Sequence, residues 1–340
     1  MAYTTINKST DYFNTKLYTG NGGTQSIDVG FQSDWTWLKS RTETKTHILI
    51  DAVRGSNKDI ISNSTAVENT DATRITGFDS DGFNLGSSST TNTNSQNFVS
   101  WNWKANGAGS ANTAGSINST VSANTTAGMS IVKYTGNGVT GATIGHGLGK
   151  IPTMMIVKNL SRVSEWTVYH KDIGNTHYLE LNSTVAKQDY DIWHDTTPTA
   201  NVFYARGHER VNYSGDNYIA YIFTDIEGYS KFSSYTGNAN AKGPFVYTGF
   251  KPAFVIIKRT NLANDWLMQD NKRYNINETV AKVLKPNSAL TEGDTGNLDI
   301  LSNGFKLRST GTNTNASGGS YIYMAFAEQP LVGDNPATAR

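Results

Sequence analysis

Hydrophobic and polar residues alternate along short stretches of this 340-residue chain, and the stretches end at turn-forming residues. In the run "FVSWNWK" from Phe98 to Lys104, Ser100 and Asn102 separate the apolar positions, a period of two that predicts a half-buried β-strand. The runs "YIAYIFT" from Tyr218 and "YIYMAFA" from Tyr321 are apolar on both faces, which is typical of a more central strand. Because residues common in turns separate such runs throughout, the pattern predicts an all-β fold with little helix.

The pattern occurs three times along the chain. "YTGN" begins at Tyr18, Tyr134 and Tyr235, and we expect each copy to end a strand and enter a hairpin turn in which Gly or Asn takes positive φ. Further residues follow each Tyr at matched positions: first Lys39, Lys158 and Lys258, then eight residues on His47, Trp166 and Trp266, and four more on Asp51, His170 and Asp270. The runs that close each copy superpose in register and match Trp103, Phe223 and Phe326. Fixed spacing through several elements indicates an internal repeat, and it predicts equivalent core positions for the last of these sets.

Strands of this length and spacing are typical of β-sandwiches. We predict three tandem related β-sandwich units, jelly-roll or lectin-like, at residues 1–105, 128–227 and 228–340, the last including a C-terminal tail. The Gly/Ser/Asn-rich segment 106–127 is either a linker or an extended strand laid along a neighbouring unit or subunit, and the alternation in "SINSTVSAN" favours the strand. The best helical candidate is "NETVAKVLKP", residues 277–286; its counterparts "LNSTVAKQDYDIW" and "GSNKDIISNSTAVE" predict loops or short helices.

Composition excludes several classes of protein. The formal net charge is +1, so no basic or acidic surplus indicates nucleic acid or an anionic membrane as partner. The chain has no cysteine, which excludes disulfides and thiolate metal sites, and its six histidines show no metal-ligand spacing. The first residues lack the pattern of a signal peptide, and no apolar run approaches the roughly 20 residues of a membrane helix. We therefore predict no metal, no cofactor, no nucleic acid and no membrane insertion.

Several stretches together resemble one family: "YTGNGGTQSI", "DWTWLKSR", "HILIDAVRG", "FDSDGFNLG", "FVSWNWKANG" and the ending "YIYMAFAEQPLVGDNPATAR". They are similar to virion structural proteins of marine bacteriophages, especially cyanophages, which are described as tail fibre or tail-associated proteins. The resemblance implies a virion protein made in the host cytoplasm, with other virion proteins and host surface glycans as partners. By analogy with phage fibres it implies a homo-oligomer, expected to be a trimer, and attachment to the particle through the N-terminal unit. Outer capsid decoration (or a head fibre) and a polysaccharide depolymerase are the alternatives.

Catalytic chemistry has weak candidates. The matched set Asp51, His170 and Asp270 has the residue types of general acid–base catalysis, but the set changes identity between repeats and no second acid accompanies it, so a polar residue at a strand end is the preferred interpretation. A glycosidase pair could come from Glu165, Asp172 and Asp189, although nothing in the sequence selects them. We predict a non-enzymatic protein with no catalytic residues.

Two loops have alternative interpretations. "FDSDGF", from Phe78 to Phe83, resembles the start of a calcium loop, but the later oxygen ligands are absent and a tight turn is favoured. "TGNGG" precedes a strand and not a helix, so it is not predicted to bind phosphate.

Host binding is predicted for loops of the second and third repeats. The first repeat departs most from the others, with Ser33 at a Pro position and His47 at a Trp position, which favours docking to the particle. Aromatic and Arg side chains give large contact area and directional hydrogen bonds. The candidate host- or glycan-binding residues are Trp166, Tyr169, Trp193, Trp266 and Arg273. The alternative is that they form core or inter-unit contacts.

Overall fold

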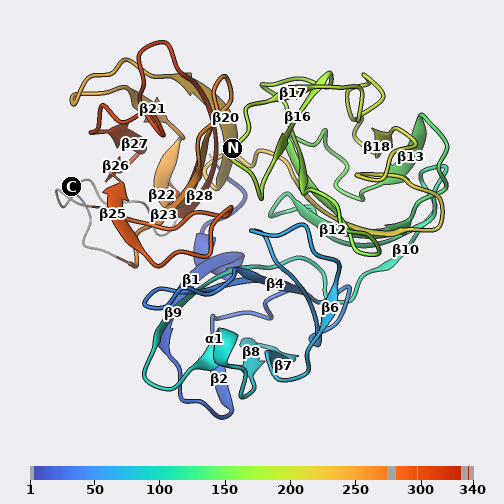
Figure 1. Ribbon diagram of the computed structural model, residues 1–340, viewed down its shortest axis with the longest axis horizontal. Helices are drawn as coiled ribbons and strands as arrows, with labels where there is room; N and C mark the ends of the chain where they lie inside the picture. Colours follow the sequence, from blue (N-terminus) through green and yellow to red (C-terminus); the bar gives the residue numbers. More distant parts are fainter. Residues whose placement is uncertain (1–3, 274–280, 297, 331–335, 337–340) are drawn as a thin grey trace.

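The computed structural model describes residues 4–273, 281–296, 298–330 and 336. The fold is all-β, which confirms the predicted class: the helical segments in these residues are a 3-10 helix, η1 (Ser9–Asp11), and one turn of α-helix, α1 (Ser89–Asn92). Figure 1 shows the strands gathered into three lobes around a common centre. In the described part of the chain, no helix is long and apolar enough to cross a membrane.

The first lobe, called unit 1, contains nine strands in two antiparallel sheets. Six of them form one sheet in the order β1-β9-β3-β4-β5-β6, and three form a smaller sheet in the order β2-β8-β7. Their bounds are β1 (Phe13–Thr19), β2 (Gln25–Asp28), β3 (Trp35–Ser40), β4 (Ile48–Asp51), β5 (Lys58–Ile60), β6 (Asn69–Thr70), β7 (Ile75–Asp79), β8 (Gly82–Leu85) and β9 (Asn97–Trp103).

The second lobe, unit 2, has a sheet in the order β10-β11-β12-β19-β14-β15-β16-β17 and the pair β13-β18. Its strands are β10 (Ser110–Asn112), β11 (Ser119–Asn124), β12 (Met129–Thr135), β13 (Ala142–Gly145), β14 (Met154–Asn159), β15 (Thr167–His170), β16 (His177–Glu180), β17 (Gln188–Asp189), β18 (Val202–Ala205) and β19 (Asn217–Phe223).

The third lobe, unit 3, has sheets in the orders β20-β28-β22-β23 and β21-β27-β26, and the pair β24-β25. Its strands are β20 (Ser230–Thr236), β21 (Phe245–Tyr247), β22 (Phe250–Arg259), β23 (Trp266–Asp270), β24 (Ala281–Val283), β25 (Gly293–Gly296), β26 (Leu298–Leu301), β27 (Gly304–Leu307) and β28 (Ser320–Pro330).

One strand order recurs in the three units. The first strand pairs with the last, the last with the strand that carries the matched Lys, and that strand with the one that carries the matched Asp or His: β1-β9-β3-β4, β12-β19-β14-β15 and β20-β28-β22-β23. The pairs β2-β8, β13-β18 and β21-β27 also correspond. This correspondence supports the division into three related units, while the jelly-roll or lectin-like topology stays a prediction.

The hydrophobic residues form one local cluster in each unit and a central core to which all three units contribute. Trp103, Phe223 and Phe326 are all buried, and all three lie in the central core. The Phe326 ring lies 5.7 Å from the Trp103 ring and 6.0 Å from the Phe223 ring, between centroids. Each unit therefore buries one face of its large sheet against the other two units.

Two local predictions have clear outcomes. Segment 106–127 contains β10 and β11, and β11 pairs along its whole length with β12, so it is the extended strand and not a free linker. The helix predicted over 277–286 was wrong where the structure describes it, since residues 281–283 form β24; residues 277–280 lie outside the described residues. The two counterparts contain no helix either, because their backbones bond to a neighbouring unit: the Glu68 N–H donates to the Leu160 carbonyl at 3.0 Å and the Lys187 N–H to the Thr260 carbonyl at 2.9 Å.

Candidate functional site: the junctions between units

The repeated "YTGN" turn is held against a buried loop of its own unit. Tyr18 stacks on Phe98 with 5.2 Å between ring centroids, and its hydroxyl donates to the Thr91 carbonyl at 2.7 Å. A Cβ on Gly20 would come 2.1 Å from the Thr93 carbonyl oxygen, so only glycine fits at this close approach. The hairpin that we predicted here was wrong, because β1 pairs with β9 and the next strand, β2, pairs with β8 in the other sheet. The positive φ that we predicted does occur, at Gly22 with φ of 69°.

Each of these turns binds a buried asparagine that the sequence analysis missed. Asn92, Asn212 and Asn315 are fully buried, and each accepts the backbone N–H of the Asn in the turn at 2.8–2.9 Å. Each side-chain amide also donates to backbone carbonyls of its surroundings. The available signal was their common position, six residues before the aromatic residue of the last strand in every repeat. The turn is thus a structural anchor.

Asp51 lies in the junction between units 1 and 2 and is completely buried. Arg54 donates from Nε to Asp51 Oδ2 at 2.5 Å, and the Tyr221 hydroxyl of unit 2 donates to the same oxygen at 2.8 Å. The Arg54 guanidinium also donates to the Leu49 carbonyl at 3.1 Å and to Glu68 Oε1 at 3.3 Å. Although burial alone would lower it, the pKa of Arg54 is raised, chiefly by the Asp51 charge. Oδ2 of this carboxylate thus joins the two units, while Oδ1 accepts the Arg54 backbone N–H of its own unit at 2.9 Å.

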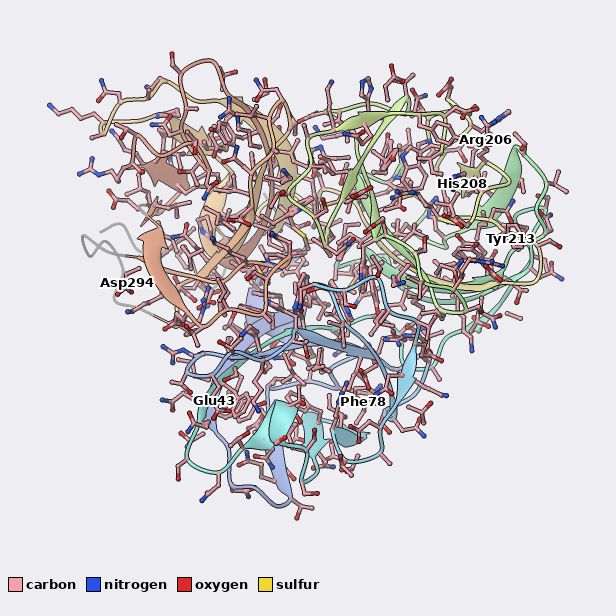
Figure 2. All side chains as sticks on the ribbon, in the orientation of Figure 1. Glu43, Phe78, Arg206, His208, Tyr213 and Asp294 are labelled. Carbon is pink, nitrogen blue, oxygen red and sulfur yellow. The ribbon has the colours of Figure 1, made fainter. Side chains whose placement is uncertain are left out.

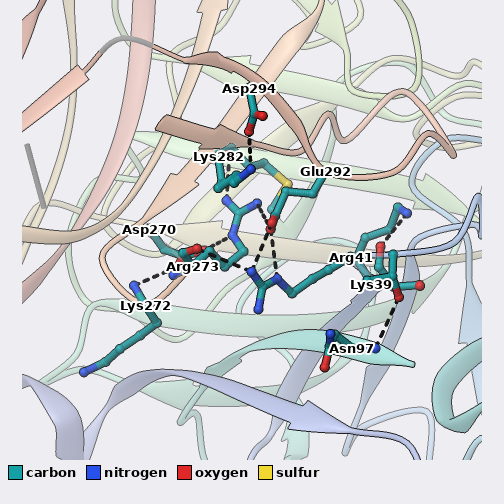
Figure 3. Close-up of polar contacts among 12 residues, drawn as sticks. Lys39, Arg41, Asn97, Asp270, Lys272, Arg273, Lys282, Glu292 and Asp294 are labelled. Atoms are coloured by element: carbon teal, nitrogen blue, oxygen red, sulfur yellow. Dashed lines mark hydrogen bonds and ion pairs between the residues drawn. The ribbon is translucent and has the colours of Figure 1, made fainter. Parts of the chain in front are cut away.

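Asp270 forms the equivalent junction between units 3 and 1, shown in Figure 3. Arg273 donates from Nε to Asp270 Oδ2 at 2.5 Å, and the indole N–H of Trp101, in unit 1, donates to the same oxygen at 3.0 Å. Arg41 of unit 1 then binds Glu292 of unit 3 in a bidentate pair at 2.9 and 3.0 Å, and Glu292 also accepts from Arg273 at 3.5 Å. Residues far apart in the sequence thereby close the ring of units.

His170 occupies the third junction, between units 2 and 3, with different chemistry. Its Nδ1 accepts the Asp172 N–H at 3.2 Å, and its buried ring also interacts with the Tyr323 backbone of unit 3. Unit 3 has Met324 at the position matched to Tyr221 and Trp101, and a thioether has no proton to donate. Burial lowers the pKa of His170 from 6.5 to about 4, so the ring is neutral near neutral pH. An anionic Asp here would lack the donor that the other two junctions supply.

Several of the remaining matched residues also bond across junctions. The indole N–H of Trp166 donates to the Ile61 carbonyl of unit 1 at 2.9 Å, and that of Trp266 donates to the Glu180 carbonyl of unit 2 at 2.8 Å. Lys158 Nζ donates to the Thr65 carbonyl of unit 1 at 3.1 Å. Burial lowers the pKa of all three matched lysines to about 8: Lys39, Lys158 and Lys258.

The predicted host-binding residues are not on the surface. Trp166, Tyr169, Trp193, Trp266 and Arg273 are each at most 4% exposed. Trp166, Trp266 and Arg273 lie in junctions, while Tyr169 and Trp193 pack edge to face within unit 2, 5.8 Å between ring centroids. Side chains this deeply buried offer no area to a glycan, so this prediction is corrected in favour of core and inter-unit contacts.

The weaker chemical candidates are also accounted for. Glu165 binds Asn182, Asp172 binds Lys171 at 2.7 Å, and Asp189 lies on the two-residue strand β17, so the structure gives these three acids different neighbours. In "FDSDGF", β7 and β8 pair through Asp79 and Gly82, which confirms the tight turn. Within residues 4–273, 281–296, 298–330 and 336, no group of three potential metal ligands occurs.

The exposed aromatic side chains among the described residues lie on units 2 and 3 at Tyr190, Tyr213, Phe245 and Tyr247. Figure 2 shows Arg206, His208 and Tyr213 at the outer side of unit 2. The Arg206 guanidinium lies over the Tyr190 ring at 5.0 Å, and the His208 ring meets the same ring edge to face at 5.5 Å. This group, Tyr190 with Arg206 and His208, has the chemistry that the sequence analysis sought elsewhere.

The fold is all-β, and buried contacts join its three lobes. The chain belongs to the family described as Domain of unknown function (DUF7483), whose profile matches residues 8–330 and therefore extends through all three units. The comparisons with curated proteins and with solved structures gave no match.

Proposed function

We propose that this chain is a non-enzymatic structural protein of a bacteriophage particle, a tail fibre or tail-associated protein. The observation that carries the proposal is the burial of the matched acids: Asp51 and Asp270 hold adjacent units together and face no cleft. The sequence resemblance to phage virion proteins is the reason for proposing that the chain is part of a phage particle. A closed body with a shared aromatic core suits a component that has to persist outside a cell.

Host contact is proposed for units 2 and 3 through their exposed aromatic residues. Tyr190 is 40% exposed and is flanked by Arg206 and His208, so a sugar ring could stack on the group while Arg bonds its hydroxyls. Unit 1 would then dock to the particle, as the N-terminal attachment of phage fibres suggests by analogy. Outer capsid decoration is the alternative location, and a homo-trimer is the expected assembly.

Labelling of particles tests the proposal directly. Gold-conjugated antibodies against the purified protein should mark tails, label on capsids would favour decoration, and unlabelled particles would reject a virion protein altogether. Incubation with host envelope polysaccharide should release no new reducing ends; their release would establish the depolymerase instead.

Full-length variants in a host-cell binding assay test whether units 2 and 3, and not unit 1, contact the host. The double variant Tyr190→Ala/Arg206→Ala should bind host cells more weakly than the parent protein. The control is Val67→Ala on unit 1, since Val67 is also 40% exposed. Loss of binding with the control and not with the double variant would reverse the proposed orientation.

A further inference from the structure

The first strands of the three units have equivalent outer edges, and the chain covers them differently. In unit 2, β11 pairs antiparallel with β12 from Ser119↔Tyr134 to Asn124↔Met129. In unit 3, β20 lies at the end of its sheet and pairs with β28 on its inner side. On its outer side, the Phe232 N–H donates to Asp225 Oδ1 at 2.8 Å. In unit 1, β1 lies at the end of its sheet, and no described strand pairs with its outer side.

The hydrogen bonds that flank β1 fix which backbone groups point outward. The Gly20 N–H donates to the Gln96 carbonyl at 2.8 Å, and the Lys104 N–H donates to the Tyr12 carbonyl at 2.9 Å. Since backbone groups alternate along a strand, even-numbered residues of β1 bond β9, and the N–H and carbonyl groups of Thr15 and Leu17 point away from it. The matched residues in unit 2, Ile131 and Lys133, are the ones that face β11.

Two lysines flank this edge. A surface hollow follows it, lined by Asn14, Thr15, Lys16, Leu17 and Lys272. Neither Lys16 nor Lys272 forms an ion pair with any described residue. In unit 2, Val132 holds the position matched to Lys16, and Val121 of β11 lies opposite it. A strand that occupied the β1 edge in the same register would place its own residue opposite Lys16.

We infer that the outer edge of β1 is a docking site for an extended, acidic segment of a partner protein. The segment adds to the sheet antiparallel, as β11 adds to β12, and carries a carboxylate opposite Lys16. Main-chain hydrogen bonds to the outward groups of β1 supply the affinity, chiefly those of the partly exposed Leu17 because Thr15 is only 5% exposed, and the lysines supply selectivity. This inference does not depend on the proposed role in a phage particle. The competing explanation is that the lysines guard the edge against strand pairing, in which case no strand binds.

Two synthetic peptides test the inference on the intact protein. One has the sequence of residues 116–124, SINSTVSAN, and the other, SINSTESAN, has Glu at the position of Val121. Fluorescence anisotropy should show saturable binding of the acidic peptide below ~1 mM and about 2- to 5-fold weaker binding of the other. Lys16→Glu should abolish this preference. Absence of binding by both peptides at that concentration would establish the guarding role and overturn the inference.

N-methylation of the acidic peptide identifies the edge without altering the protein. Ser122 of β11 lies opposite Ile131 of β12, whose backbone groups face β11, so the Ser122 N–H faces β12. Backbone groups alternate along a strand, so the Val121 N–H faces away from β12. Methylation at the position of Ser122 should weaken binding at least about tenfold, and methylation at the position of Val121 should leave it nearly unchanged. Equal effects of the two methyl groups would contradict strand addition.

A protein variant locates the site on β1. Leu17→Pro removes an outward N–H and no bond to β9, so the fold should be retained, and the peptide should bind at least about tenfold more weakly. Leu17→Ala removes the same side chain and keeps the N–H, so it should bind normally. NMR amide exchange adds a readout on the parent protein: the peptide should slow exchange at Thr15 and Leu17. Normal binding by Leu17→Pro, or unchanged exchange at both residues, would place the peptide elsewhere.

Discussion

Replacing Arg54 by Met tests whether the buried junctions hold the units together. The substitution keeps the length and apolar stem of the side chain and removes the guanidinium. It takes away the 2.5 Å ion pair with Asp51 and the bond to the Leu49 carbonyl, and it leaves the Asp51 carboxylate buried with the Tyr221 hydroxyl as its side-chain partner. Both charged side chains are at most 1% exposed, so water cannot replace the lost contacts.

The expected cost follows from that burial. Removing one member of a buried ion pair leaves an uncompensated charge, which costs about 3–5 kcal/mol of unfolding free energy. The double variant Asp51→Asn/Arg54→Met has no such charge, and it should be more stable than Arg54→Met by about 1 kcal/mol or more. The order of stability is therefore parent, then double variant, then Arg54→Met.

Urea unfolding followed by intrinsic tryptophan fluorescence measures these differences, because tryptophans lie in the core that the units share. Lys8 and Asp11 form the matched control: they have the same i,i+3 spacing at 2.6 Å, but their side chains are 60% and 49% exposed. Lys8→Met should change stability by about 0–1 kcal/mol. The reasoning is refuted if Arg54→Met costs no more than this control, or if Asp51→Asn and Arg54→Met are additive.

Three further outcomes follow from the structure. Trp103→Ala should cost about 3–5 kcal/mol and, because its core is shared, should shift a single unfolding transition and not release one unit; two separate transitions would contradict the shared core. Asn212→Ala should cost about 1–3 kcal/mol by leaving the Asn137 N–H without its acceptor, whereas Asn201→Ala, at an exposed position, should be close to neutral in the same assay. The pKa of His170 is lowered on folding from 6.5 to about 4, so the unfolded state binds more protons between these values; stability should fall as pH decreases through this range, and His170→Gln should flatten that part of the profile. If stability of the His170→Gln variant depends on pH as steeply as that of the parent protein, His170 is not the source of the pH dependence.

Much of the fold could be predicted from the sequence because the strands and turns depend on residues that are close together in the chain. The run "FVSWNWK" and the spacing repeated from Lys39 to Asp51 predict the strands and their recurrence, and the structure places the corresponding strands in one order. The half-burial predicted for that run was wrong, because Ser100 and Asn102 are fully buried in β9. The helix over 277–286 was predicted from local propensity, but residues 281–283 form a strand that pairs with β25. Pairing with β25, in the same unit, decided that segment and overrode its local helix propensity.

The binding residues were mispredicted for a related reason. Whether Trp166 or Arg273 is exposed depends on a neighbouring unit that lies far away in the sequence. A repeat considered alone has one face of its large sheet exposed, and the junction residues then resemble a ligand-binding surface. Aromatic and Arg side chains with a fixed position in each repeat serve equally well for contact with a sugar and for contact with the next copy of the repeat.

The sequence nevertheless contained a signal for these contacts, in the relation between two matched positions. Asp51 and Asp270 each meet a side chain with a proton to donate, Tyr221 and Trp101, on the unit that they contact. In unit 3 the residue matched to Tyr221 and Trp101 is Met324, which has no proton to donate. In unit 2 the residue matched to the two Asp residues is His170, which is stable in the low-polarity junction as a neutral ring. A matched position that changes from Asp to His is hard to reconcile with a catalytic acid. The change is expected if the residue at this position suits the side chain that the next unit places against it. The change of residue type that argued against catalysis therefore also argued for burial between the repeats.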